Sequence, residues 1–407
     1  MNKLWSYPRP RSMTNLETIL CHSETSLRKE GANKINQLRN NILDMLESPN
    51  FQNKTVDETL QCVGNYFNYW LIFVTTIENR KTQFMTKGIF QSVWKSTIHS
   101  KKEYSQSCWR FETVMIGLLY ASILFNKAVR EKEVQGEKKK DWMDPLLKSY
   151  SILRNICLCN ITSWTLRKET ELPFECTLEG CKCLIGMCLV ELQHYAIHYV
   201  ENELNFCTKF KLNYWIYKKI DEIKSQLKCR IKDQTIQGHS WSEISDMYKL
   251  EAVAHMYFLY AQHIKDVEQE IVSDLIIQSH YITEVSLEII KTCKKKLLSK
   301  TTTFPFINSA NSGDINNDDI FFQRITSFES QVSNFLSDLT SSIDSQCLST
   351  VKERSKVLPD VRNLITKDWF EVLYYKKIRK VQEPHYDYYV PENQQSQRLF
   401  YDELFYD

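Results

Sequence analysis

Four clustered cysteines form the first candidate metal site in this sequence. They are Cys176, Cys181, Cys183 and Cys188. Structural zinc sites use cysteine pairs about two to four residues apart on turns. These cysteines instead alternate with apolar residues such as Leu184 and Met187 in a stretch with helical periodicity. We therefore interpret them as small buried thiols and predict no metal or other cofactor there.

His194 and His198 are a second candidate, because residues four apart lie on one face of a helix. A metal held by this pair needs a third ligand, for which Glu191 or Glu201 is available. We favour the other interpretation, an exposed polar helix face with one or two packed imidazoles. A metal-dependent helical-bundle enzyme using Glu191, His194 and His198 remains an alternative that metal analysis of the purified protein would test.

The segment from residue 194 to 219 combines aromatic and basic side chains. Aromatic residues recur every three or four positions, at Phe206, Phe210, Tyr214 and Tyr217. A more polar set surrounds them, comprising Tyr199, Lys209, Lys211 and Asn213. This pattern fits an ordinary core stripe. It also fits a helix face that takes up an amphipathic partner helix.

The composition points away from catalysis. The 407 residues include nine glycines and nine prolines, and 52 basic against 50 acidic residues leave a net charge of +2. So few glycines disfavour an α/β enzyme, whose turns and phosphate loops need them. No GxGxxG, GxxxxGK[ST], GxSxG or HExxH motif occurs. The near-zero charge disfavours an electrostatically driven nucleic-acid binder.

The elements that must position these residues are mostly long amphipathic helices. We expect them at residues 30–48, 56–79, 106–133, 143–164, 174–204, 206–231, 241–268, 270–299 and 320–345. Short gaps predict antiparallel hairpins in one continuous body, although no strict solenoid repeat is found. The polar residues 301–319 predict a long exposed loop, and residues 369–378 are β-branched and aromatic, as expected of an extended segment.

Cysteine usage and the N-terminal sequence predict a cytoplasmic protein. Thirteen cysteines occur without an apolar signal segment at the start. The apolar run within residues 113–126 is too short to span a membrane. The lysine runs at 138–140 and 294–296 fit solvated helix ends. Peripheral membrane contact through a basic patch is the alternative.

Several landmarks occur in an order that resembles one known family. They are Trp5, FMTKGIFQSVWKSTI at 84–98, CWRFETVMIGLLYASILFNKA at 108–128, SWSEISDMYKLEAVAHMYFLYAQH at 240–263, FFQRITSFESQVSNFLSDL at 321–339, VLYYKKI at 372–378 and the acidic segment 385–391. Their order and spacing resemble the BRO domain family, the helical domain of Alix and Brox. The length suits a Brox-like protein that consists of a BRO domain alone.

The resemblance implies a mostly α fold: a curved, banana-shaped BRO domain with a tetratricopeptide-like helical-hairpin core and a few short strands from the chain ends. The domain would span residues 1–391, with the loop at 301–319 and an insertion at 346–368. An acidic, Tyr-rich tail would follow at 392–407. One departure is the C-terminus ELFYD, which lacks the family's prenylation box, so farnesyl anchoring is not expected.

The resemblance also implies a non-enzymatic scaffold in endosomal sorting or membrane remodelling. Its partner would be the C-terminal amphipathic helix of an ESCRT-III subunit of the charged multivesicular body protein type. The expected partner-binding residues are Ile197, Tyr199, Phe206, Phe210, Lys211 and Tyr214. Another register places Lys209 and Asn213 at the two later positions. A generic tetratricopeptide-like adaptor is the runner-up, and it predicts equal hairpins and no terminal strands.

Overall fold

The computed structural model describes residues 8–16, 26–47, 56–79, 90–96, 102–135, 143–163, 172–199, 206–231, 239–267, 273–301 and 320–342. The chain divides into two compact units, Met1–Leu358 and Pro359–Asp407, and every described residue belongs to the first. Several predicted segments lie outside the described residues. They are residues 302–319 of the predicted loop, the insertion 346–368, the extended segment 369–378 and the tail 392–407. The boundary at residue 391 therefore stays a prediction.

A small antiparallel sheet lies in the N-terminal part of the chain. Its strands are β1 (Arg9–Met13), β2 (Ser92–Lys95) and β3 (Glu103–Gln106), in the order β1-β2-β3. Trp94 pairs with Pro10 on one side and with Tyr104 on the other. Strand β1 agrees with the expectation of a short strand from the N-terminal end of the chain. Strands β2 and β3 lie between α3 (Val56–Asn79) and α4 (Trp109–Gln135), where the sequence analysis predicted no strand.

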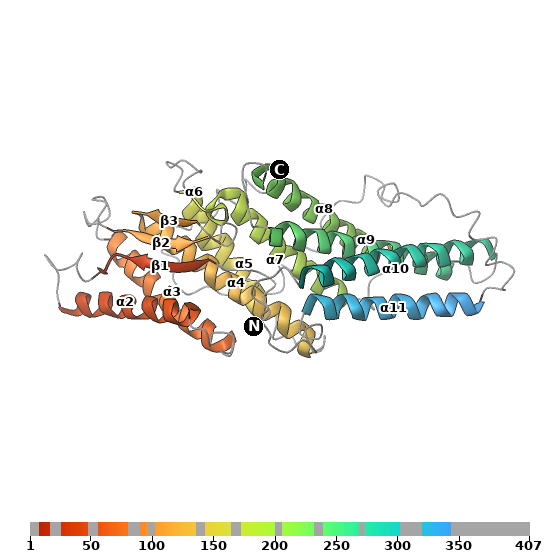
Figure 1. The fold of residues 1–407 in the computed structure, drawn as a ribbon, viewed down its shortest axis with the longest axis horizontal. Coiled ribbons are helices and arrows are strands. Elements are labelled where there is room, and N and C mark those ends of the chain that lie inside the picture. Colours follow the sequence, from red (N-terminus) through yellow and green to blue (C-terminus); the bar gives the residue numbers. More distant parts are fainter. Residues whose placement is uncertain are drawn as a thin grey trace. The chain divides into compact units, whose positions relative to one another are not determined.

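Helices α2 (Ser26–Glu47), α3 (Val56–Asn79) and α4 (Trp109–Gln135) pack beside this sheet (Figure 1). Residues Trp109–Val129 of α4 are long and apolar enough to cross a membrane, but 94% of their most apolar window is buried within the protein. Burial on all sides is typical of a core helix. The expectation that the apolar run within residues 113–126 is too short to span a membrane is corrected, because the run belongs to a longer apolar helix that is buried in the protein.

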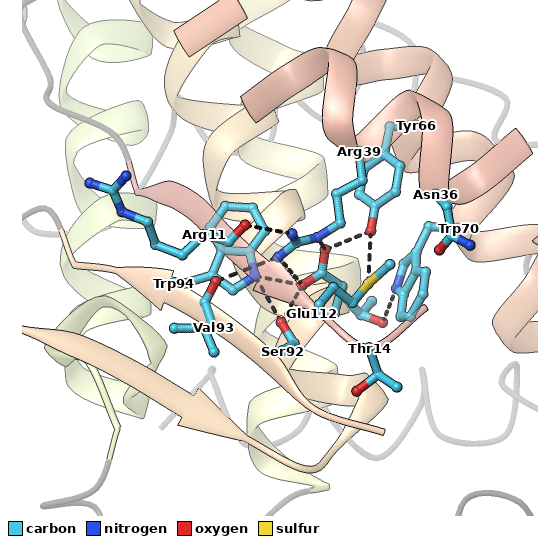
Figure 2. Close-up of polar contacts among 12 residues, drawn as sticks. Arg11, Thr14, Asn36, Arg39, Tyr66, Trp70, Ser92, Val93, Trp94 and Glu112 are labelled. Carbon is cyan, nitrogen blue, oxygen red and sulfur yellow. Dashed lines mark hydrogen bonds and ion pairs between the residues drawn. The ribbon is translucent and has the colours of Figure 1, made fainter. Parts of the chain in front are cut away.

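A buried carboxylate joins the sheet to α2, α3 and α4. Arg39 of α2 donates from Nε to Glu112 Oε1 over 2.9 Å, and the Tyr66 hydroxyl donates to the same oxygen over 2.6 Å. The hydroxyl of Ser92 and the indole N–H of Trp94 donate to Oε2. Figure 2 shows these side chains converging on Glu112 from separate elements. Arg39 and Glu112 are 3% and 0% exposed, so the pair is fully enclosed.

The next segment differs from the single helix predicted at 143–164. It consists of α5 (Met143–Ser151), a π-helical segment (Ile152–Leu158) and α6 (Cys159–Thr162). The π-helical segment packs against α4 at Gly117. A Cβ at Gly117 would come within 2.7 Å of Cys157 Sγ, so the glycine permits this close approach.

From residue 178 on, the described residues form long helices that pack in sequence order. They are α7 (Leu178–Tyr199, after a 3₁₀ turn at Phe174–Cys176), α8 (Phe206–Ile231), α9 (His239–Val267), α10 (Ser273–Thr301) and α11 (Ile320–Ser342). Each contacts the next, and α9, α10 and α11 lie side by side (Figure 1). The predicted succession of antiparallel helical neighbours is confirmed, and the fold is mostly α with a small sheet.

Candidate functional site

Three consecutive helices and the more distant α11 form a pocket of about 470 Å³. We call it the α11 pocket, after the helix that contributes most to it. Its lining comes from α7 (His194, Ile197), α8 (Lys209, Asn213), α9 (His255, Phe258, Leu259, Gln262) and α11 (Phe328, Gln331, Asn334, Phe335, Asp338). The pocket therefore lies against the α7–α8 hairpin that the sequence analysis singled out.

The hairpin begins where the chain turns sharply into α7. The N–H of Gly180 donates to the Thr177 hydroxyl over 3.1 Å, which satisfies one of the unpaired amides at the helix start. A Cβ at Gly180 would overlap the carbonyl oxygen of Phe174 in the preceding turn. The absence of a side chain at this position allows the turn to pack directly on α7.

The structure places the predicted partner-binding residues differently. Ile197 lines the pocket, although its exposed fraction is only 8%. Phe210 and Tyr214 are 5% and 8% exposed and are not among the residues that line it. Lys211 is half-buried on the same helix. The side chains of Tyr199 and Phe206 lie outside the described ones.

The two residues of the alternative register, Lys209 and Asn213, line the α11 pocket. Each of them precedes one of the two buried aromatic residues. Asn213 is held within α8 because its side-chain amide donates to the Lys209 carbonyl oxygen over 3.0 Å. The part of Phe210 and Tyr214 in partner binding stays a prediction. Tyr214 stacks on Tyr217, with ring centroids 6.0 Å apart.

Aromatic rings from α9 and α11 form the apolar part of the pocket. The Phe258 ring meets Phe328 and Phe335 edge to face, with centroids 5.8 and 5.4 Å apart. His255 stacks on Phe328, with ring centroids 3.7 Å apart. Edge-to-face aromatic pairs add to the stabilisation from area burial. The sequence analysis missed these residues, because it treated α9 and α11 separately from the hairpin.

A buried ionic cluster lies next to the pocket and joins α7, α9 and α11. We call Glu191, His194, Tyr248, Glu251 and Arg324 the Arg324 cluster. Arg324 donates from Nη1 to Glu191 over 3.2 Å and from Nη2 to Glu251 over 2.5 Å. The Tyr248 hydroxyl donates to Glu191. His194 Nε2 lies 3.9 Å from the Glu251 carboxylate, and its side chain is 3% exposed, so the expectation of an exposed helix face is wrong at this residue.

Charge placement explains how this cluster is tolerated inside the protein. Glu191 and Glu251 are 1% and 2% exposed, and one guanidinium lies between them. Burial raises the pKa of Tyr248 well above its ordinary value, and the Glu191 carboxylate raises it further. The phenol therefore stays protonated as a donor. Arg324 also lies over the Tyr248 ring, 5.0 Å from its centroid.

The metal hypotheses gain no support from this arrangement. Glu191 accepts hydrogen bonds from Tyr248 and Arg324. His198 is not among the residues whose side chains the structure describes. The four clustered cysteines are free, buried thiols, as predicted. Burial raises the pKa of Cys183 and of Cys188 to about 12, which disfavours the thiolate that metals bind. Within the described ranges, no group of three His, Cys, Asp or Glu residues is arranged to hold a metal ion.

Comparison with known proteins gives matches in structure only. No protein-family profile matches the sequence. No curated protein sequence matches it either. A Bro1 domain studied for endosomal targeting is 13% identical with a TM-score of 0.53, over 93% of this chain and 95% of that one. The ALIX BRO1 domain in a complex with CHMP4C is 10% identical with a TM-score of 0.56, over 89% and 91%.

A third solved structure is ALIX in complex with the SIVmac239 PYKEVTEDL late domain. It is 11% identical, with a TM-score of 0.52. The match covers 98% of this chain but 53% of that one, so this chain spans about half of that larger protein. At such identities the likeness establishes the fold, and function must be argued from the site itself.

Proposed function

We propose that this chain, which has the fold of a Bro1 domain, is a non-enzymatic adaptor that binds an amphipathic helix of an ESCRT-III subunit in the α11 pocket. The observation that carries the proposal is the position of the pocket. It lies on the α7–α8 hairpin, which the resemblance to BRO domains marks as the partner-binding element. CHMP4C, the partner in one similar complex, is the ESCRT-III subunit that we take as the probe.

The chemistry of the pocket suits helix-in-groove recognition. Leu259 and Phe335, which are half-buried, offer apolar contacts for the buried face of a partner helix. The other apolar lining residues, Ile197, Phe258 and Phe328, are at most 8% exposed. Polar groups of Lys209 and Asn213 lie beside them. Apolar anchors supply most of the affinity in such interfaces, while flanking charges set orientation and specificity. An acidic residue of the partner helix would pair with Lys209.

The test compares two lysines on one helix. Lys209 lines the pocket, whereas Lys211 does not and belongs to the other predicted register. We expect Lys209→Glu to weaken binding of the CHMP4C C-terminal peptide at least tenfold, or about 1.4 kcal/mol. Lys211→Glu should change the Kd less than about twofold. Isothermal titration calorimetry on the full chain measures both.

Two results would count against this assignment. If Lys211→Glu weakens binding and Lys209→Glu does not, the partner uses the register of Phe210 and Tyr214. If the unmodified chain does not bind the peptide, the proposed function is wrong. Matching melting temperatures of the variants exclude unfolding as the cause of any loss.

The cellular setting belongs to the same proposal. An adaptor of this kind would act in the cytoplasm, at endosomes or other remodelled membranes. Peripheral membrane contact through the lysines at 294–296 is part of this expectation. Lys294 is bonded to Glu329 over 2.5 Å, which reduces the free positive charge of that run. Fractionation of cells with and without the protein's ESCRT-III partner would test the localisation.

A further inference from the structure

Helix α11 presents one continuous stripe to the pocket. Phe328, Gln331, Phe335 and Asp338 are three or four residues apart, and all of them line the pocket. Residues at this spacing share one face of a helix. Gln331 and Asp338 are exposed, while Phe328 is buried against α9. This face of α11 thus combines a buried apolar part with an accessible polar edge.

Arg324 fixes the rotation of this stripe. It lies one turn before Phe328, and it bridges Glu191 of α7 and Glu251 of α9. Two bonds to two different helices restrict both the rotation and the translation of α11. Helix α11 is therefore held against α7 and α9, which also line the pocket. It is held there despite its distance along the chain, since α8 ends at Ile231 and α11 begins only at Ile320.

The pocket carries opposite charges on two of its helices. Lys209 lies on α8 and Asp338 lies on α11. Helix α9 packs against α8, and its Phe258 packs against Phe328 and Phe335 of α11. A helix lying in this pocket would therefore have a basic group on its α8 side and an acidic group on its α11 side.

We infer that α11 is a second recognition wall, so that the bound helix contacts α8 and α11 together and carries an acidic residue toward Lys209 and a basic residue toward Asp338. The inference rests on the proposed function and specifies its partner. Opposite charges on the two walls would also select one orientation of the bound helix, because the reversed helix would bring like charges together.

The experiment places the same lysine at two neighbouring positions of α11. Asp338 lines the pocket, whereas Ser337 is also exposed but does not line it. Binding of the CHMP4C C-terminal peptide to the full chain is measured by calorimetry at low and at physiological salt. We expect Asp338→Lys to weaken binding about fivefold at low salt and less at higher salt. Ser337→Lys should leave the Kd within about twofold.

The outcomes separate this inference from the function beneath it. If Lys209→Glu weakens binding while Asp338→Lys has no more effect than Ser337→Lys, the partner does not contact α11 and the inference is overturned. The same holds if Asp338→Lys strengthens binding, because the partner then presents an acidic residue to α11. If the unmodified chain does not bind the peptide, the proposed function fails, and the inference fails with it.

Discussion

Glu112 shows how one side chain can organise the N-terminal half of the chain. Burial alone would raise the pKa of this carboxyl. The Arg39 guanidinium, together with hydrogen bonds from Arg39, Ser92 and Tyr66, outweighs burial, so the pKa lies below its ordinary value. A carboxyl whose pKa falls on folding stabilises the native state at neutral pH. That contribution is lost as the pH falls from about 4.3, the unfolded value, through the lower folded value.

We predict that Glu112→Gln lowers the free energy of unfolding at pH 7 by about 3–5 kcal/mol, because it leaves Arg39 as an unpaired buried charge. The stability of the variant should also fall less steeply than that of the unmodified protein below about pH 4.3. Urea denaturation at several pH values measures both effects. The control is Glu103→Gln on β3, where the side chain is 51% exposed. It should cost less than about 1 kcal/mol. Equal losses in the two variants would show that the Glu112 pair contributes no more than a surface pair.

At the scale of single helices, two helical glycines should respond oppositely to alanine. A Cβ at Gly31 of α2 would meet no other atom within 4 Å, whereas a Cβ at Gly180 of α7 would overlap Phe174. We predict that Gly31→Ala stabilises the protein by about 0.5–1 kcal/mol through helix propensity. Gly180→Ala should destabilise it by about 1–3 kcal/mol. Thermal unfolding of both variants is the measurement, and stabilisation by Gly180→Ala would contradict the packing of the turn on α7.

We expect the attachment of α11 to depend on Arg324 more than on the pair of Lys294 and Glu329, which is partly exposed at 22% and 21%. We predict that Arg324→Met costs about 3–5 kcal/mol, because Glu191 and Glu251 then stay buried without their cation. Lys294→Met, which breaks a pair between α10 and α11, should cost less than about 1 kcal/mol. Chemical denaturation compares the two. Adding Glu191→Gln and Glu251→Gln to Arg324→Met should restore part of the loss, and failure to do so would mean that unpaired charge is not its cause.

The sequence predicted the helices well because the period of apolar residues is a local property. The helix expected at residues 56–79 coincides with α3. The π-helical segment and strands β2 and β3 could not be predicted in the same way. Their short patterns depend on packing against α4 and on pairing across the chain. Tertiary contacts decide such short segments more than propensity does.

The predicted partner-binding residues stay a prediction, but the α11 pocket lies on the same hairpin and is lined mostly by other residues. The aromatic stripe of Phe210 and Tyr214 is the most visible pattern in that helix, and it is buried. The pocket instead uses Lys209 and Asn213, one position earlier, which lie about 100° away around the helix axis. The contribution of α11 carried no sequence signal, because it depends on a long-range bridge from Arg324 to two other helices.

At the scale of the whole molecule, the pocket exists only when distant parts of the chain are folded together. Its lining begins at His194 and ends at Asp338. The net charge of +2 provides little long-range attraction. Affinity and specificity must therefore come from the local arrangement of apolar and charged groups. Binding should consequently stabilise α7, α8, α9 and α11 as a unit, since ligands stabilise the state to which they bind.

Hydrogen–deuterium exchange provides the measurement for this coupling. We predict that saturating CHMP4C peptide slows amide exchange in residues 206–213, 255–262 and 328–338 together, because local opening of any of these segments would disrupt the occupied pocket. Exchange in α2 and α3, which contribute no residue to the pocket, should stay unchanged and serves as the internal control. Protection confined to residues 206–213 would mean that the partner binds the hairpin alone. Protection across the whole described chain would indicate general stabilisation and would argue against a ligand held by these four helices.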